Sequence, residues 1–224
     1  VQGTDNVIQS CFDNDVQRLV VASSAAVYGN ADNLPLREQD AGQTLSPYAE
    51  SKWTNEQQIL NARNNGLKAT ALRFFNVYGV GQRPDGAYAA VVPKFVDMMV
   101  NKQAPVINGD GLHTRDFVHV DDVCNAIWSL IDGEWKSQNH YVYNVATQTK
   151  VTLLDLIAII NNTLTSEVPN FTPLIPTHGP ERVGDIRHSM ASIARISETI
   201  QWSAMVAFEQ GIKELVLQRL NSQS

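Results

Sequence analysis

Two strand-like segments separated by a helical segment constrain the fold of this chain more than any other feature. Residues 18–22 form a short apolar run, which is typical of a strand buried on both faces of a sheet, and residues 68–74 have the pattern of a second buried strand. Residues 47–65 lie between them and have the pattern of a helix that ends at Asn65-Gly66. Strand–helix–strand order indicates parallel strands joined by a right-handed crossover. The sequence therefore predicts an α/β fold built on a parallel sheet.

The remaining segments extend this pattern and then change it. Further elements are expected as helices over 3–15, 88–102, 121–132 and 153–164 and as a strand over 141–145. Thr152 is placed to cap the helix over 153–164. Beyond Pro169, repeated prolines mark a loop before two short helices near 191–200 and 204–220. The prediction is a partial doubly wound sheet with a smaller C-terminal lobe.

Composition excludes several classes of protein. The chain has 224 residues, 43% of them apolar and 18% charged, which is ordinary for a soluble globular protein. A net charge of −6 without a Lys/Arg cluster argues against a nucleic-acid surface, and no apolar run is long enough to span a membrane. Cys11 and Cys124 are isolated and are expected to be buried thiols in a cytoplasmic protein, and Trp128 is expected in the core. The histidines show no ligand spacing, so no metal is assigned.

Tyr48 and Lys52 form the most suggestive chemical pair. With Pro47 opening the helix, the two side chains are one turn apart on the same face. A tyrosine normally titrates near about pH 10, and a neighbouring ammonium group favours the phenolate. Ser24 ends the first apolar run, where open α/β sheets bind their ligands, and its hydroxyl can share a proton. The pattern predicts an acid–base site, although such a pair alone also fits the surface of an amphipathic helix.

A second polar cluster follows the next strand. Arg73-Phe74-Phe75-Asn76-Val77-Tyr78-Gly79 ends that strand and is expected at the same sheet edge as Ser24. The sequence contains no complete G-x-G-x-x-G motif and no P-loop, so the usual site for a dinucleotide pyrophosphate is missing.

These ordered motifs resemble the extended short-chain dehydrogenase/reductase family, and within it the nucleotide-sugar epimerases. The resemblance includes the stretches 23–29, 73–79, 109–120 and 182–185 and runs nearly end to end. It implies a partial Rossmann-like sheet. Residues 1–80 would be the remaining part of the NAD-binding domain. Residues 81–224 would be mainly the substrate-binding lobe, with 117–150 returning to the sheet.

The resemblance also implies roles for individual residues. Tyr48 would take the proton from the sugar 4-hydroxyl, with Ser24 sharing that hydrogen bond. Lys52 would hold the nicotinamide ribose of NAD and stabilise the phenolate, and Ser23 and Phe75 would lie near the cofactor. Contacts to the UDP part of the substrate would come from Asn76, Ala90, Val91, Asn108, Arg115, Arg182 and Asp185. The two arginines suit diphosphate oxygens because a guanidinium group forks around them.

The reaction and the sugar are predicted from small side chains. Related dehydratases need an acid pair directly after the serine, and this chain has Ala25 and Ala26 there, so 4-epimerisation is favoured. Ser189 resembles a position where epimerases of non-acetylated sugars carry a bulky tyrosine. A small side chain leaves room for a 2-acetamido group, which favours interconversion of UDP-N-acetylglucosamine and UDP-N-acetylgalactosamine.

An alternative hypothesis starts from the missing glycine-rich part. Val1-Gln2-Gly3-Thr4 resembles the middle of a family helix, so the preceding strands are expected to be absent. The chain would then be a non-catalytic nucleotide-sugar-binding or oligomerisation remnant. An unpaired apolar sheet edge would favour self-association. In relatives, the helices matching 3–15 and 47–65 form a dimer contact, so a homodimer or larger homo-oligomer is expected.

Overall fold

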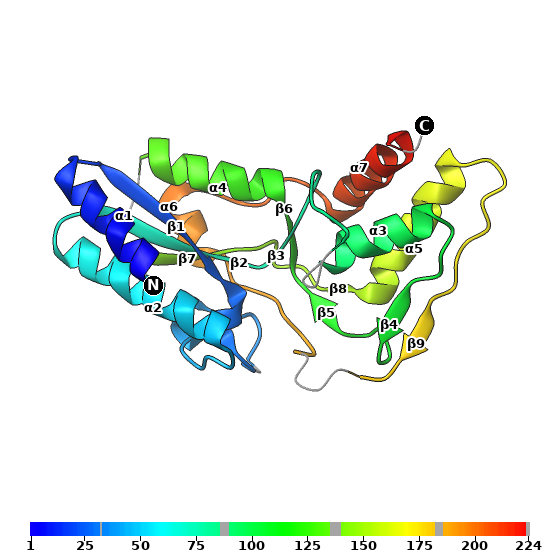
Figure 1. The fold of residues 1–224 in the computed structure, drawn as a ribbon, viewed down its shortest axis with the longest axis horizontal. Coiled ribbons are helices and arrows are strands. Elements are labelled where there is room, and N and C mark those ends of the chain that lie inside the picture. The colour runs from blue at the N-terminus through cyan, green and yellow to red at the C-terminus, as the bar shows by residue number, and fades with distance from the viewer. Residues whose placement is uncertain (32, 86–89, 135–139, 182–185, 223–224) are drawn as a thin grey trace.

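The computed structural model describes residues 1–31, 33–85, 90–134, 140–181 and 186–222 and has two lobes along its long axis (Figure 1). The lobe that contains the N-terminus is built on a parallel sheet, whereas the other lobe is mainly helical. The described strands of this sheet, in spatial order, are β1 (Arg18–Ser24), β2 (Lys68–Phe74) and β7 (Val142–Val145). The predicted α/β class with a parallel sheet is confirmed.

Helices cover both faces of this sheet. One face carries α1 (Gln2–Asp13) and α2 (Pro47–Asn64), and the other carries α4 (Val120–Asp132) and α6 (Ala194–Ile200). Successive side chains of a strand point to opposite faces. In β1, Leu19 and Val21 accordingly pack against the core under α1 and α2, and Val20 packs against the core under α4 and α6. Burial on both sides explains the short apolar run of this strand.

The helix α2 has clear signals at both ends. The Ser46 hydroxyl caps it by accepting a hydrogen bond from the backbone N of Ala49 at 3.1 Å. Pro47 occupies the first turn, where its missing N–H group is not needed. Asn65 is the C-cap, and Gly66 follows with a φ of 97°, a conformation that ends the helix. The helix therefore matches the predicted segment 47–65 closely.

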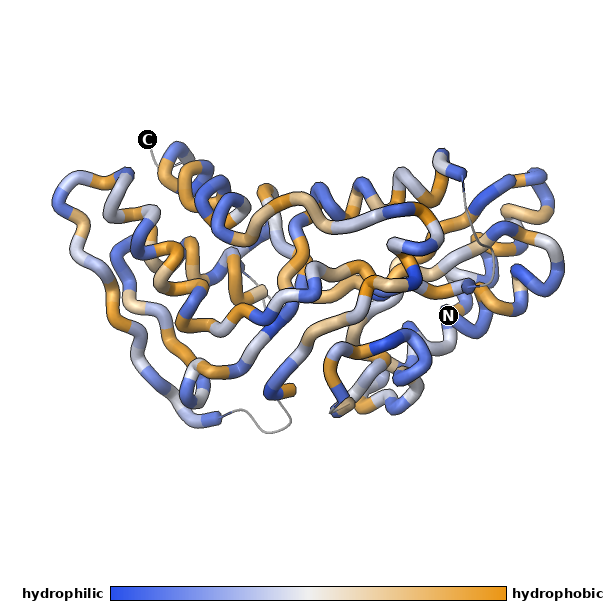
Figure 2. The backbone as a smooth tube through the Cα atoms, turned by 180° about the vertical axis from the view of Figure 1, so that it is seen from behind, coloured by the Kyte–Doolittle hydropathy of each residue, from blue (hydrophilic) through white to orange (hydrophobic). Residues whose placement is uncertain are grey.

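The smaller lobe packs its helices around a separate apolar core. These helices are α3 (Val91–Val100), α5 (Leu153–Glu167) and α7 (Phe208–Asn221). The outer helices alternate between orange and blue along their length in Figure 2, as expected when one helix face is packed and the other is solvated. No helix in the described residues is long and apolar enough to cross a membrane.

Short strands and 3-10 helices complete the described part of the fold. The paired strands are β3 (Asn76–Tyr78) with β6 (Phe117–His119), β4 (Val106–Asn108) with β9 (Thr177–Gly179), and β5 (Thr114–Arg115) with β8 (Val151–Thr152). The 3-10 helices are η1 (Ala25–Tyr28) and η2 (Glu38–Asp40). The sequence did not predict these short strands, because two or three residues carry no readable periodicity.

The longer elements were predicted well. The segments 3–15, 121–132, 141–145 and 153–164 correspond to α1, α4, β7 and α5. Thr152 caps α5 as predicted, with its hydroxyl accepting a hydrogen bond from the backbone N of Asp155 at 3.0 Å. The helix expected over 88–102 is α3, which begins at Val91, and residues 86–89 lie outside the described part. The C-terminal segments near 191–200 and 204–220 contain α6 and α7.

Two predictions about buried side chains are wrong. Trp128 is 65% exposed, and Cys124, one turn earlier on α4, is also exposed. Val123 and Ala126 fill the face of α4 that packs on the sheet, so the residues on the opposite face lie outside the core. Cys11 is buried as predicted.

Candidate active site

Ser24 lies at the carboxyl end of β1, where the chain turns into η1. Its hydroxyl oxygen accepts a hydrogen bond from the backbone N of Ala26 at 3.2 Å and so caps this short helix. Ser24 is in register with Phe74, the last residue of β2. The two strand ends therefore meet at one edge of the sheet, as parallel order predicts.

The helix α2 directs Lys52 toward the same end of β1. Lys52 Nζ donates a hydrogen bond to the carbonyl oxygen of Ala22 at 3.0 Å and lies 5.7 Å from the centre of the Tyr48 ring. Tyr48 is 55% exposed, so its phenol is accessible to a bound molecule. The arrangement places a cation and a phenol together at a strand end, which suits acid–base chemistry.

A cavity of about 390 Å³ opens at this edge of the sheet. Its lining includes the predicted site residues Ser24, Phe75, Asn76, Arg115 and Ser189. Its volume lies in the range of small-molecule sites, roughly 300–1,000 Å³. The cavity therefore joins residues from β1, β2, β3, β5 and the segment after residue 186.

The cavity wall beside Ser24 is formed by small side chains. Ala25 and Ala26 of η1 both line the cavity next to Ser24. Neither methyl group can donate or accept a proton, so Ser24 supplies the polar group on this part of the wall.

Asp116 is buried and links segments that carry predicted site residues. Its backbone carbonyl accepts hydrogen bonds from the backbone N and from Nδ2 of Asn76, at 3.1 and 3.0 Å. Its carboxylate accepts hydrogen bonds from the backbone N atoms of Thr147, at 2.7 Å, and Ala191, at 3.2 Å. Burial raises the pKa of this carboxyl group, and the hydrogen bonds from Thr147 act in the opposite direction. Asn76 and the segment that follows Ser189 are thus anchored to one residue.

His188 lines the cavity and is held in place by Thr114. The backbone N of Thr114 donates to the carbonyl of Arg187 at 2.9 Å, and the backbone N of Ser189 donates to the carbonyl of Thr114 at 3.1 Å. The Thr114 hydroxyl and His188 Nδ1 are 2.9 Å apart, so a hydrogen bond whose direction depends on the tautomer orients the imidazole. His188 lines the cavity together with its neighbour Ser189.

Sequence reasoning missed Asp116 and His188 as parts of the site. Asp116 directly follows Arg115, and His188 directly precedes Ser189. Each is therefore the sequence neighbour of a predicted site residue. The adjacent motif residues were the available signal. What the sequence hides is the buried hydrogen bonding of the first residue and the cavity-facing position of the second.

Several predicted site residues do not line this cavity. They are Ser23, Tyr48, Lys52, Ala90, Val91 and Asn108. Ala90 is the N-cap of α3, Val91 is its first residue, and Asn108 ends β4, so these three belong to the smaller lobe. Ser23 is buried, and its hydroxyl donates a hydrogen bond to Glu56.

Two predicted substrate contacts, Arg182 and Asp185, lie outside the described residues. Within the described part of the chain, no group of three or more His, Cys, Asp or Glu side chains is arranged to hold a metal ion.

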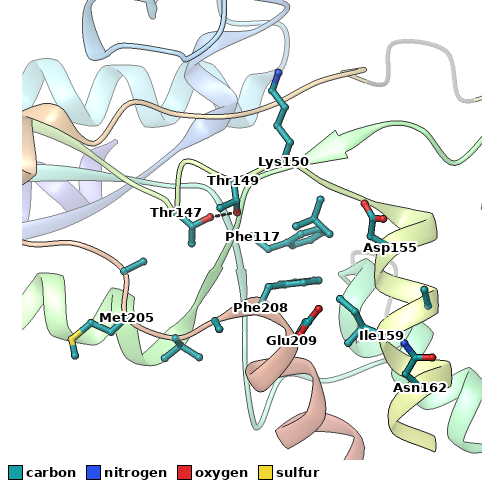
Figure 3. Close-up of a pocket in the computed structure, with 15 residues that line it drawn as sticks. Phe117, Thr147, Thr149, Lys150, Asp155, Ile159, Asn162, Met205, Phe208 and Glu209 are labelled. Carbon is teal, nitrogen blue, oxygen red and sulfur yellow. Dashed lines mark hydrogen bonds between the residues drawn. The ribbon is translucent and has the colours of Figure 1, made fainter. Parts of the chain in front are cut away.

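A larger cavity of about 650 Å³ lies between α5 and the start of α7 (Figure 3). Phe117 and Phe208 stack in its lining with 5.1 Å between ring centres. Its lining among the described residues contains no predicted site residue. Two of its polar groups bond within the fold: the Thr147 and Thr149 hydroxyls are 2.6 Å apart (Figure 3), and the Asp155 carboxylate accepts a hydrogen bond from the backbone N of Thr152. We therefore place the candidate site in the smaller cavity, where polar groups converge on the sheet edge.

Comparison with known proteins agrees with the observed α/β fold. Residues 1–146 match the NAD dependent epimerase/dehydratase family. A protein of Methanocaldococcus jannaschii named "Putative UDP-glucose 4-epimerase" is 34% identical over 218 residues, which cover 96% of this chain and 67% of that protein.

Two solved structures share the fold. The UDP-N-acetylglucosamine 4-epimerase from Methanobrevibacter ruminantium M1, in complex with UDP-N-acetylmuramic acid, has a TM-score of 0.88 at 33% identity. The match covers 100% of this chain and 69% of that one. The UDP-glucose 4-epimerase from Thermotoga maritima, with UDP-glucose, has a TM-score of 0.86 at 28% identity and covers 99% and 69%. The chain thus spans about two thirds of the length of the relatives it matches.

Proposed function

Because the chain belongs to the NAD-dependent epimerase/dehydratase family, we propose that it carries the catalytic and substrate-binding part of a UDP-sugar 4-epimerase. The observation that carries the proposal is the grouping of Tyr48, Lys52 and Ser24 around the carboxyl end of β1, beside a cavity of substrate size. Ala25 and Ala26 favour epimerisation, because the family resemblance implies an acid pair directly after the serine in dehydratases and neither alanine can transfer a proton.

The proposed mechanism divides the work between cofactor and protein. The chemistry supplied by NAD, when bound, is reversible hydride transfer at C4 of the sugar. Tyr48 takes the proton from the 4-hydroxyl and returns it after the 4-keto sugar has rotated to present its other face. Ser24 shares the hydrogen bond to that oxygen. Lys52 holds the ribose hydroxyls and keeps a positive charge beside the phenol.

The residues present fit the nicotinamide end of NAD. Phe75 is only 4% exposed and lines the cavity. Its side chain would give the nicotinamide ring a flat apolar surface. Lys52 reaches the carboxyl end of β1, where ribose hydroxyls can meet its ammonium group. Ser23 would contact the cofactor through its backbone, because its hydroxyl already donates a hydrogen bond to Glu56. The sequence has no G-x-G-x-x-G turn, so these contacts concern this end of the cofactor only.

The UDP part of the substrate is assigned to two further residues of the cavity lining and to the smaller lobe. Arg115 and Asn76 line the cavity and suit phosphate oxygens. Ala90 and Val91 begin α3, where free backbone N–H groups suit the oxygens of uracil. The remaining assigned contacts rest on the family resemblance alone: Asn108, Arg182 and Asp185.

The proposed sugar substrates are UDP-N-acetylglucosamine and UDP-N-acetylgalactosamine. Ser189 lines the cavity and is 8% exposed, so its side chain bounds the space available to the sugar. A hydroxymethyl group leaves room for a 2-acetamido substituent, whereas an aromatic ring in the same place would fill it.

Turnover of matched substrates tests this assignment. The chain is supplied with NAD and with each of four substrates: UDP-N-acetylglucosamine, UDP-N-acetylgalactosamine, UDP-glucose and UDP-galactose. Product formation is followed by NMR of the anomeric protons. We expect the acetylated pair to give the higher kcat/KM. Faster turnover of the plain hexoses would contradict the argument from Ser189.

A second candidate is a nucleotide-sugar-binding or oligomerisation protein without catalysis. The specific observation in its favour is the absence of a G-x-G-x-x-G turn from the sequence. Calorimetric titration of the chain with NAD and with UDP-sugar separates the two functions. Binding of UDP-sugar without turnover would support the second candidate, and turnover well above background would refute it.

We also propose that the chain associates with itself through α1 and α2. Val7 and Phe12 of α1 are 49% and 38% exposed, so this side of the larger lobe presents apolar surface. A homodimer that packs these helices against their copies would cover that surface.

A further inference from the structure

Successive turns of α2 contact successive residues of β1. Lys52 Nζ donates a hydrogen bond to the carbonyl oxygen of Ala22 at 3.0 Å. One turn later, the carboxylate of Glu56 accepts a hydrogen bond from the Ser23 hydroxyl. Tyr48, Lys52 and Glu56 are spaced four residues apart and therefore lie on adjoining turns of one helix face. The placement of the acid–base pair relative to β1 thus depends on the same face that carries Glu56.

Glu56 is held by a buried ion pair with Arg73 of β2. Arg73 Nε donates to one carboxylate oxygen at 2.9 Å, and Nη2 donates to the other at 2.7 Å. The Arg73 side chain is 1% exposed and that of Glu56 is 0% exposed. Burial alone would lower the pKa of Arg73, but the hydrogen bonds to Glu56 and the nearby charges raise it overall. The pair is therefore a fixed, charged fork between α2 and the sheet.

The ion pair is connected to the cavity wall. Arg73 Nη1 donates to the phenol oxygen of Tyr28 at 3.0 Å, and that phenol donates to Oδ1 of Asn144 in β7 at 2.6 Å. Tyr28 lines the cavity, as does Phe75, and their ring centres are 6.0 Å apart. One hydrogen-bonded network thus joins α2, β1, β2 and β7 to the wall of the candidate site.

Stability alone does not account for such a pair. Apolar side chains of similar size often stabilise a buried position as well as an ion pair does, because burying charges is costly. A bidentate pair differs from apolar packing in permitting one relative placement of its two elements. We propose that Glu56 and Arg73 are positioning residues, which hold the stripe of α2 that carries Tyr48 and Lys52 in one register beside Ser24. The roles of these three residues rest on the proposed function, whereas their placement is measurable without it.

The Glu56→Met/Arg73→Met double variant of the full chain tests the proposal. It removes both charges and keeps apolar volume, so the sheet should remain folded. The reporters are nuclear Overhauser effects (NOEs) by NMR. We expect loss of the contact between the Lys52 side chain and Ala22, while contacts between β1 and β2 persist. In the epimerase assay, kcat should fall about 100-fold with KM changed less than about threefold, as for a misplaced catalytic group. A Lys52–Ala22 contact of wild-type intensity in the folded double variant would overturn the proposal.

A matched control removes another ion pair between elements. Arg219 of α7 pairs with Asp97 of α3 in the smaller lobe, with Nε and Oδ1 2.7 Å apart. Arg219→Met should leave the Lys52–Ala22 contact and kcat at wild-type values. A loss equal to that of the double variant would show that any lost ion pair has this effect, and would overturn the specific role of Glu56 and Arg73.

A conservative variant keeps the test decisive if the double variant does not fold. Glu56→Asp retains the buried charge opposite Arg73 but shortens the side chain by one methylene group. We expect a weakened Lys52–Ala22 contact and a fall in kcat of about 10-fold. An unchanged contact in this variant would overturn the proposal. Absence of turnover in the wild-type chain would contradict the proposed function alone, because the NMR contacts report the placement directly.

Discussion

The ammonium nitrogen of Lys52 lies 5.7 Å from the centre of the Tyr48 ring, across one turn of α2. If Tyr48 is the base, Tyr48→Phe removes the proton acceptor and keeps the ring. We expect kcat to fall about 100- to 10,000-fold, the range for a lost general acid–base group, with little change in UDP-sugar affinity. Turnover by NMR and affinity by calorimetry check this. Tyr141→Phe, which changes a partly buried tyrosine outside the cavity lining, is the control; equal losses in both variants would contradict the assignment.

Arg115 should contribute most of its effect to UDP affinity. It lines the cavity, so Arg115→Met is expected to weaken UDP binding by about 1.5–3 kcal/mol, the value of a hydrogen bond to a charged group. Arg187 is the matched control, because its side chain is 54% exposed and pairs with Asp110 away from the cavity lining. Arg187→Met should change affinity by less than about 1 kcal/mol. Calorimetry with UDP measures both, and equal effects would argue against a diphosphate contact at Arg115.

Ser189 should set the preference between acetylated and plain sugars. Ser189→Tyr places a ring in the cavity, which should lower kcat/KM for UDP-N-acetylglucosamine relative to UDP-glucose by about 10- to 200-fold. Ser189→Ala keeps the space and should keep the preference. The ratio of kcat/KM for the two substrates is the measurement. An unchanged ratio in Ser189→Tyr would indicate that the sugar does not bind next to this residue.

Tyr28 should weaken the fold at alkaline pH. Burial raises the pKa of Tyr28 from 10.0 to about 12, although Arg73 acts to lower it. Between these values the unfolded chain releases the phenolic proton and the folded chain retains it, so the unfolded state binds fewer protons. The free energy of unfolding therefore falls as pH rises from 10 to about 12.

Tyr28→Phe removes this proton and isolates its effect. Between pH 10 and 12 the free energy of unfolding should decrease less in the variant than in the wild type. The two decreases should differ by about 2–3 kcal/mol. At pH 7 the variant should be less stable by about 1–3 kcal/mol, because Arg73 and Asn144 lose a buried partner. Urea unfolding at each pH measures both quantities, and parallel pH profiles would contradict the buried, protonated phenol.

Self-association through α1 should be sensitive to charge at Val7. Val7→Glu places a carboxylate on the exposed apolar side of α1, so the sedimentation coefficient should fall toward that of a monomer. Trp128→Glu changes a still more exposed apolar residue on α4, across the sheet, and should leave the assembly unchanged. A wild-type chain that sediments as a single monomer at all concentrations would refute the association.

The predictable parts of this fold are those with long local patterns. The strand β1 contains a short apolar run, and α2 has Pro47 and Asn65-Gly66 as end signals, so both were recognisable from sequence. The site required contacts between distant segments. The hydrogen bonds of Asp116 to residues 147 and 191 depend on the folded path of the chain. The prediction that Trp128 is buried was wrong for a related reason. Its apolar character indicated burial, but its helix face points away from the sheet.

The position of β1 at the end of the strand order has a consequence for hydrogen exchange. Among the described strands, β1 pairs with β2 alone, whereas β2 pairs on both sides. In a parallel strand, successive amides point alternately to the two neighbours. Every second amide of β1 therefore points to β2, and the others point to the open side. An exchange experiment on the isolated chain should show slow and fast amides alternating along β1, beside uniformly slow amides where β2 is paired on both sides. A strand that pairs with the open side of β1 would make all the paired β1 amides exchange slowly.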